Sequence, residues 1–351
     1  MHPLLSNYFN FIHKFTSPIK ESSSVGLDIG TSECKLIEIS KSNDSFELLS
    51  WAVDPVLDGN VAATLQKMLS RLKIPCKAPY TSIFGKGTLI RYIDMPRMSK
   101  DELKNSFGIE SDKYFPFPQD KIYTDCYILD AQAAGQQMSV MAAAVKREIV
   151  DQRIKLLSDL GAQADFIGLD SIALANVINV LGCKEEADKN TGMALLDMGD
   201  TVSNLTIFVD RLPRFSRDIY IGGRDFTKSI SNALGVGFAD AEKLKINPGE
   251  RLKDVAIAYE SVIGNIVQEL KLSFDYFVTE RNKEIQTLLL TGGCSLLTGV
   301  SDTLKSNLEI KVQAWDPFSN IKINPELSGV EIHKNAAKLS VALGLALYDY
   351  D

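Results

Sequence analysis

Histidine and cysteine are scarce and scattered in this chain of 351 residues. Three histidines and five cysteines are present, without a Cys-x-x-Cys pair or a histidine cluster. Structural zinc and iron–sulfur sites need several such ligands at short spacing, so a metal–thiolate centre is not expected. Cysteines without a disulfide framework are typical of a reducing compartment. The pattern therefore favours a cytosolic protein.

Long apolar runs and basic clusters are absent as well. No run approaches the roughly 18 to 20 apolar residues that span a bilayer, and the first residues lack the basic stretch and cleavage site of a signal peptide. The formal net charge is -7 and lysines and arginines form no stripe, so nucleic acid is not an expected partner. A length of 351 residues with 45% hydrophobic content instead predicts a globular chain of about two domains.

Residues 1–16 carry an aromatic stripe at helical spacing, which includes Tyr8, Phe11 and Phe15. A proline and several serines follow and are typical of a linker, so we treat 1–21 as an N-terminal amphipathic segment. The stripe suits docking on a membrane surface or on a partner. It suits packing against the protein's own first domain equally well.

Two short segments with an Asp-x-Gly pattern follow apolar runs and precede alternating ones, so each is predicted to form the turn of a β-hairpin. Glycine allows the backbone angles of such a turn and leaves N–H groups free to face an anion. The aspartate lies where it could hold the hydration shell of Mg²⁺. Two such hairpins facing each other could clamp a nucleoside triphosphate. The candidate residues are Asp28, Gly30, Thr31, Ser32, Asp197, Gly199, Asp200 and Thr201, with Asp28 and Asp197 as the candidates for binding magnesium through water.

A glycine pair near the other end of the chain forms a third candidate segment. Gly292 and Gly293 come directly after the apolar, strand-like run 285–290 and are predicted to open a helix. Paired glycines permit close approach of a flat purine or a ribose, and a helix N-terminus adds positive potential. With Cys294, they are candidates for binding the nucleoside.

The order and spacing of the three segments resemble the actin, Hsp70 and sugar-kinase superfamily of ATP-binding proteins, over almost the whole chain. The resemblance implies an α/β, actin-like (ribonuclease H-like) fold of two domains, with ATP and Mg²⁺ as cofactors. It also implies that Lys35 contacts phosphate, because it follows Asp28 by seven positions as the corresponding lysine does in actin. Asp200 matches the second acidic residue of actin's second phosphate loop. Glu33 departs from the pattern, since a carboxylate inside the first loop repels a triphosphate unless its side chain points away.

Three further residues acquire candidate roles from the same resemblance. Asp170 begins an alanine-rich segment like the connecting helix of Hsp70 and FtsA, which makes it a candidate catalytic residue that orders magnesium or the attacking water. Glu242 and Lys245 match the pair that contacts adenosine in Hsp70. Ordinary roles remain open for each residue. Lys35 also suits a solvated charge on a strand edge and Asp170 a helix cap, while Glu242 and Lys245 suit an i,i+3 surface pair.

The periodicity of the remaining chain predicts further helices and strands. Strand patterns around a helix that begins at a Ser99-x-x-Glu102 capping box indicate a subdomain inserted at about 80–145. A helical block is predicted at about 225–284. We therefore expect domain 1 over 22–187, containing the insertion and completed by 332–351, and domain 2 over 188–331, containing the helical block.

Three segments narrow the resemblance to the PilM family, the actin-like proteins of type IV pilus assembly: residues 110–118, 122–129 and 217–227. The place of the insertion agrees with the branch that contains FtsA and PilM. The resemblance implies a cytoplasmic scaffold, peripheral to the inner membrane through its partners. Its expected ligand is the N-terminal cytoplasmic peptide of PilN, a protein with one membrane span, in a groove between the inserted subdomain and domain 1. PilO and the pilus motor ATPases are implied as indirect partners, and a homo-oligomer is compatible with the resemblance.

The expected activity is binding of ATP, which sets the angle between the domains, with at most slow ATP hydrolysis. A small-molecule kinase of the same superfamily is the alternative. A kinase needs an acceptor pocket and a base near the γ-phosphate, and no acidic or histidine signal beyond Asp170 and Asp200 indicates one. A division-type bacterial actin is a further alternative, although FtsA would be expected to end in a basic amphipathic helix that this sequence lacks.

Overall fold

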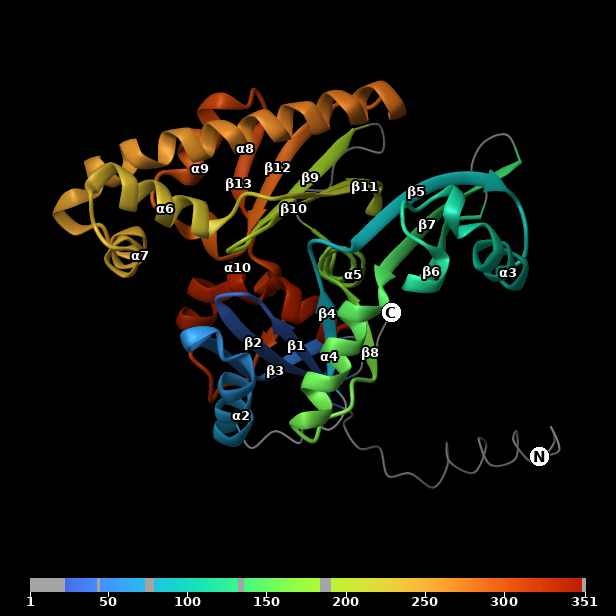
Figure 1. Cartoon of the computed structure of the whole chain (residues 1–351), viewed down its shortest axis with the longest axis horizontal. Coiled ribbons are helices and arrows are strands. Elements are labelled where there is room, and N and C mark those ends of the chain that lie inside the picture. The colour runs from blue at the N-terminus through green and yellow to red at the C-terminus, as the bar shows by residue number, and fades with distance from the viewer. Residues whose placement is uncertain (1–22, 43–44, 73–78, 132–135, 184–190, 349–351) are drawn as a thin grey trace.

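The computed structural model of the chain describes residues 23–42, 45–72, 79–131, 136–183 and 191–348. Three sheets organise these residues, and helices α5 and α10 lie between the two larger sheets (Figure 1). The predicted N-terminal segment 1–21 lies outside the described residues. No helix within the described ranges combines the length and the apolarity needed to cross a bilayer.

The first sheet has six strands in the order β14-β3-β2-β1-β4-β8. Strands β1, β2 and β3 form an antiparallel meander, and β4 and β8 continue the sheet in parallel beside β1. The strands are β1 (Ser23–Ile29), β2 (Glu33–Ser42), β3 (Ser45–Pro55), β4 (Tyr80–Ile83), β8 (Phe166–Leu169) and β14 (Lys322–Ile323).

Helices cover both faces of this sheet because successive residues of its strands are apolar on both sides. Leu36 on β2 belongs to a core with Leu65 and Leu157, whereas the next residue, Ile37, belongs to a core on the opposite face. That second core also contains Phe208 of the second sheet, so one apolar layer joins the two sheets. The covering helices are α2 (Val61–Leu72) and α4 (Arg147–Asp159) on the first face and α5 (Asp170–Leu181) and α10 (Gly329–Ala346) on the second.

The second sheet repeats the plan of the first, in the order β11-β10-β9-β12-β13. Its first three strands form an antiparallel meander, and β12 and β13 continue the sheet in parallel beside β9. The long helix α8 buries residues such as Ile266 and Leu270 in the core of this half. The elements are β9 (Gly192–Met198), β10 (Ser203–Val209), β11 (Leu212–Ile219), α6 (Gly223–Leu234), α7 (Phe238–Ile246), α8 (Leu252–Arg281), β12 (Ile285–Thr291), α9 (Val300–Asn307) and β13 (Lys311–Ala314).

The third sheet has the order β5-β7-β6 and lies to one side of the two large sheets (Figure 1). Helix α3 packs on it through Leu103 and Phe107. The predicted capping box is confirmed, because Glu102 N donates to Ser99 Oγ at 3.3 Å and the Glu102 carboxylate accepts from Ser99 N at 2.8 Å. The elements are β5 (Thr88–Pro96), α3 (Lys100–Glu110), β6 (Ile122–Asp130) and β7 (Gln137–Lys146).

Three details differ from the sequence-based expectations. The short run Tyr80–Ile83, expected at the start of the insertion, pairs with β1 and β8, because its partners are set by topology and not by its own pattern. Strand β11 was not expected. The helix predicted after Gly292 is a single 3₁₀ turn, η5 (Gly293–Leu296), since adjacent glycines favour a turn over a helix.

Candidate functional site

Two matching hairpin turns lie at corresponding places in the two large sheets. In the first turn, Gly30 N donates to Glu33 O at 3.1 Å. In the second, Gly199 N donates to Val202 O at 3.1 Å. The β-hairpins predicted from the Asp-x-Gly pattern are therefore confirmed, and the same local hydrogen bond closes each.

The two turns face one cleft of about 660 Å³. It brings together most of the candidate residues from three distant parts of the chain. Lys338 of α10, which no sequence pattern indicated, lines the cleft with them. The predicted residues that line it are Asp28, Gly30, Thr31, Ser32, Lys35, Asp170, Asp197, Gly199, Asp200, Thr201, Gly292 and Gly293.

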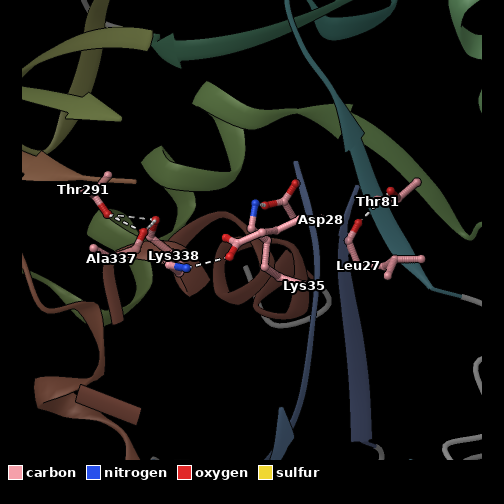
Figure 2. A network of polar contacts seen from close by, with 9 residues as sticks. Leu27, Asp28, Lys35, Thr81, Thr291, Ala337 and Lys338 are labelled. Atoms are coloured by element: carbon pink, nitrogen blue, oxygen red, sulfur yellow. Dashed lines mark hydrogen bonds and ion pairs between the residues drawn. The ribbon is translucent and has the colours of Figure 1, made fainter. Parts of the chain in front are cut away.

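Lys35 on β2 lies opposite Asp28 on β1 in the strand register, and the two side chains form an ion pair. The Lys35 Nζ to Asp28 Oδ2 distance is 3.1 Å (Figure 2). Its side chain is only 15% exposed, so it is not the solvated edge charge that the sequence also allowed. Burial alone would lower the pKa of Lys35, but the carboxylates of Asp28 and Glu33 outweigh burial and raise that pKa. Lys35 is therefore a firmly charged group inside the cleft.

Glu33 is paired with Lys338 instead of pointing freely into the first turn. Lys338 Nζ lies 2.6 Å from Glu33 Oε1, and both side chains are about three-quarters buried. Figure 2 shows Lys338 extending toward the space that Asp28 and Lys35 occupy. The negative charge of Glu33 was expected from the sequence to repel phosphate. In the structure, the positive charge of Lys338 on α10 balances it. A lysine inside the otherwise apolar stretch around Ala337 was the signal that could have found Lys338.

Carboxylates gather at the floor of the cleft, and the charge of Asp28 contributes to raised pKa values of the other two, Asp170 and Asp197. Burial, followed by the charge of Asp28, raises the pKa of Asp197 to about 7, with Lys35 opposing the shift. The same two causes raise the pKa of Asp170 well above its ordinary value, and the Ser82 hydroxyl and Arg153 oppose that shift only partly. Asp170 and Asp197 therefore ionise less readily in this corner of the cleft than they would in water.

Asp170 is the first residue of α5, after the N-cap residue Leu169, so the helix-cap role open at the sequence level is not the one observed. Its Oδ1 is buried and has no hydrogen-bond partner at good geometry in the described part of the chain; the same holds for the nearby hydroxyl of Ser82, which nevertheless lowers the pKa of Asp170. A buried oxygen without a partner is costly unless a ligand, an ion or water satisfies it. The side chain is thus directed at something the cleft would hold.

The donor set suits a hydrated divalent cation. Among the described residues, no three carboxylate, histidine or cysteine side chains gather closely enough to coordinate a metal directly. Magnesium characteristically keeps several waters and needs only one or two carboxylates. Asp28 and Asp197 fit that requirement, because both line the cleft and Asp28 raises the pKa of Asp197.

Glu242, Lys245 and Cys294 gather beside the second hairpin but outside the cleft lining. The Lys245 side chain is 6% exposed, and its Nζ lies 2.7 Å from Glu242 Oε2 and donates to Gly223 O at 3.2 Å. Cys294 Sγ donates to Gly199 O at 3.2 Å. Lys245 is therefore a buried group, and the interpretation of this pair as an ordinary surface ion pair is wrong.

Two glycines allow the backbone to approach these groups. Gly292 has φ +83°, and a Cβ there would collide with the Asp197 carboxylate and the Met198 backbone. A Cβ on Gly223 would lie 2.7 Å from Cys294 Sγ and 3.2 Å from Lys245 Nζ. A larger side chain at Gly292 would therefore displace Asp197 in the cleft, and one at Gly223 would displace Cys294 and Lys245 beside it.

The cleft continues away from the hairpins as a groove beside the inserted sheet. One wall is β5 with Tyr92, and the other is β11 with Phe215 and α8 with Leu272 and Tyr276. Leu272 and Tyr276 are more than half exposed. The second sheet and α8 thus form the wall of this groove opposite the inserted sheet. The peptide groove expected between the inserted subdomain and domain 1 stays a prediction.

Comparisons with known proteins agree with this architecture. A family model described as type IV pilus assembly protein PilM matches residues 26–350. Among solved structures, the chain is similar to one described as a PilM-PilN type IV pilus biogenesis complex, with a TM-score of 0.84, 22% identity, and coverage of 94% of this chain and 99% of that chain. MreB5 of Spiroplasma citri bound to ADP gives a TM-score of 0.50 at 12% identity, covering 93% of this chain and 96% of that one. The predicted actin-like α/β fold is therefore confirmed.

Curated relatives match a smaller share of the chain. The cell division protein FtsA of Enterococcus faecalis is 22% identical over 206 residues, which cover 52% of this chain and 47% of FtsA. FtsA of Enterococcus hirae is 24% identical over 224 residues, covering 57% and 50% respectively. The chain thus spans about half the length of these two curated relatives.

Proposed function

The chain belongs to the PilM family of type IV pilus assembly proteins, and on that premise we propose that it is a nucleotide-controlled scaffold of the pilus assembly platform. ATP, held with Mg²⁺ between the two hairpins, sets the angle between two domains and thereby the shape of a peptide groove. The observation that carries this proposal is the pair of equivalent turns facing one cleft, beside the unpartnered oxygen of Asp170.

Each group in the cleft has a role in this proposal. The backbone N–H groups of the turns and Lys35 bind the phosphates, and the carboxylates of Asp28 and Asp197 hold the waters of Mg²⁺. The cation would supply positive charge where carboxylates now repel one another. Asp170, with a raised pKa, would orient a water near the terminal phosphate, which is consistent with slow hydrolysis.

The nucleotide proposal is tested by thermal unfolding of the full chain with magnesium ATP. A ligand that binds only the folded state stabilises it by about 2.7 kcal/mol at a hundredfold excess over Kd, so the melting temperature rises. Asp28→Ala and Gly293→Glu should abolish the rise, whereas Asp240→Ala, an exposed carboxylate on α7, should keep it. A wild-type chain that neither shifts nor binds a fluorescent ATP analogue would contradict the proposal.

A kinase of the same superfamily remains the alternative, and turnover separates the two. A scaffold should hydrolyse ATP far below the roughly 1 to 100 s⁻¹ of working kinases. Sugars and small carboxylates should not accelerate it. Turnover in the kinase range with any such acceptor would replace the scaffold by an enzyme.

We extend the proposal to a partner of the kind named in the related complex, the N-terminal cytoplasmic peptide of a PilN-like protein. The groove offers the features that bind extended peptides, because β5 and β11 are both edge strands and α8 presents the apolar side chains of Leu272 and Tyr276. A peptide of about ten residues with alternating apolar side chains would match this surface.

Fluorescence anisotropy with that peptide tests the groove. The full chain and a shortened chain lacking residues 1–20 should bind equally, at micromolar Kd. Tyr276→Asp should weaken binding at least tenfold, whereas Ile257→Asp, which changes an equally exposed apolar residue of α8 outside the cleft, should not. Binding that is lost with residues 1–20, or unaffected by Tyr276→Asp, would contradict this site.

The same proposal includes the division of the chain into domain 1 over 22–187 with 332–351 and domain 2 over 188–331. It also includes a cytoplasmic location at the inner membrane through the peptide, indirect contact with PilO and the motor ATPases, and self-association. Co-purification with the PilN-like partner, in membranes that contain or lack it, tests the location.

A further inference from the structure

Lys338 occupies a fixed position at the junction of the two sheets. The carbonyl of the preceding residue, Ala337, accepts hydrogen bonds from Gly292 N at 2.9 Å and from Thr291 Oγ1 at 3.1 Å. Thr291 Oγ1 also contacts Ser340 Oγ at 2.9 Å. Because the backbone of α10 is anchored here to the end of β12, the long Lys338 side chain is the part that can move.

The two lysines that line the cleft at the hairpins are both engaged by carboxylates. Lys35 is paired with Asp28 and Lys338 with Glu33, at 3.1 Å and 2.6 Å. An anion that enters the cleft must therefore compete for these ammonium groups. The two pairs are not equivalent, because Asp28 faces the candidate magnesium position whereas Glu33 lies within the first turn itself.

We propose that Lys338 is a second phosphate-binding residue and that Glu33 limits nucleotide affinity by competing with the phosphates for it. This inference rests on the proposed nucleotide site and identifies which residue sets its strength. The ligand is the diphosphate or triphosphate part of a nucleotide, because only that part carries charge enough to displace a carboxylate. When Lys338 turns to the phosphates, Glu33 loses its partner and is left beside an anion, which costs affinity.

The chemistry fixes the sign of each substitution. Glu33→Gln keeps the size of the side chain but removes the competing charge, so it should tighten binding of the phosphates. Lys338→Met keeps the aliphatic stem but removes the ammonium and leaves Glu33 unpaired, so it should weaken binding. The double variant has lost one charge of each sign and should return close to wild type.

Isothermal titration of the full chain with magnesium ADP and, separately, with adenosine tests the inference. We expect Glu33→Gln to bind magnesium ADP about three- to tenfold more tightly and Lys338→Met about tenfold more weakly, by the strength of charge-assisted hydrogen bonds. Adenosine affinity should not change in either variant. Lys334→Met, which removes an exposed lysine of the same helix that is paired with Glu331, should behave as wild type.

Tighter binding by Glu33→Gln is an outcome that structural damage does not produce, so it decides the matter even if Lys338→Met fails to fold. Unchanged or weaker magnesium ADP binding by Glu33→Gln would overturn the inference, as would parallel changes for adenosine. A wild-type chain that binds neither ligand would overturn the nucleotide site itself. Failure of the inference alone is recognised by a wild type that binds and a Glu33→Gln variant that gains nothing.

Discussion

The hydroxyl of Thr31 in the first hairpin donates a hydrogen bond of 3.1 Å to the carboxylate of Asp200 in the second. The contact links the turns of two different sheets directly across the cleft. Both residues were predicted from the sequence to face a phosphate group. A nucleotide that contacts both residues would have to separate or rearrange this pair.

Removing this link should loosen both turns. An intramolecular hydrogen bond contributes about 0.5–1.5 kcal/mol net, so Thr31→Val should speed hydrogen exchange at the Gly30 and Gly199 amides roughly two- to tenfold without nucleotide. Exchange measured by mass spectrometry or NMR checks this. Ser32→Ala, a neighbouring hydroxyl substitution in the same turn, is the control and should leave the Gly199 amide unchanged. Equal rates in Thr31→Val and wild type would mean that the link carries no stability.

Asp197 should make the ligand-free protein less stable as pH rises. Its pKa of about 7 in the folded chain exceeds the value of about 3.9 expected when unfolded. The folded state therefore holds the extra proton between these values, and stability falls as pH increases from about 4 to 7 and stays low above. Asp197→Asn should melt about 2 °C or more above wild type at pH 8, with a smaller gap at pH 5. Glu260→Gln, which changes an exposed residue of α8, should leave the melting temperature unchanged at both pH values. A difference between Asp197→Asn and wild type that is the same at pH 5 and pH 8 would contradict the assignment of this pKa to Asp197.

Gly292 should tolerate a methyl group far less well than another glycine with the same backbone angle. Gly292→Ala adds a collision with Asp197 and Met198 to the strain of a positive φ, whereas Gly299, at φ +86°, has open space around its Cβ position. Gly299→Ala should cost about 1 kcal/mol and Gly292→Ala more than twice that. Urea unfolding of both variants supplies the comparison. Equal losses would show that the backbone around Asp197 yields easily.

Lys245 should contribute to the free energy of unfolding, because its charged side chain is buried and paired. Lys245→Met removes the ion-pair partner of Glu242 and one donor to the Gly223 carbonyl. The Thr227 hydroxyl still contacts both acceptors, so we expect a loss of about 1–3 kcal/mol. Lys243→Met, which removes an exposed ion pair with Asp240 on the same helix, should cost at most about 1 kcal/mol. Chemical denaturation checks the contrast. If the two variants lose the same amount, the buried position of Lys245 has no energetic weight.

Local features of the fold could be predicted from the sequence because their causes lie within a few residues. The Asp28 and Asp197 hairpins depend on a glycine placed between two alternating runs, and the start of α3 depends on the Ser99 and Glu102 pair. The apolar positions of α2 likewise recur at helical spacing within the helix itself. Such signals can be recognised in the sequence without knowing which elements pack together.

Contacts between distant elements could not be predicted in the same way. The Lys338 and Glu33 pair joins residues 305 positions apart, and the sequence around either residue does not indicate the other as its partner. For Glu242 and Lys245 the sequence could not separate a surface pair from a buried one, because the i,i+3 spacing is identical for both. The pairing of Tyr80–Ile83 with β1 and β8 could not be predicted either, because it is decided by the sheet and not by those four residues.

The placement of α10 has a consequence for synthesis on the ribosome. Leu339 and Leu343 of this helix share a core with Ile37 and Ile39 of β2, so the face that α5 covers in part is fully covered only when this late helix has been made. The second sheet, from Gly192 to Ala314, is contiguous in the chain and can form its own core earlier. The half of the molecule that is translated first is therefore the half that is completed last, and its exposed apolar face is the region where a chaperone would be needed.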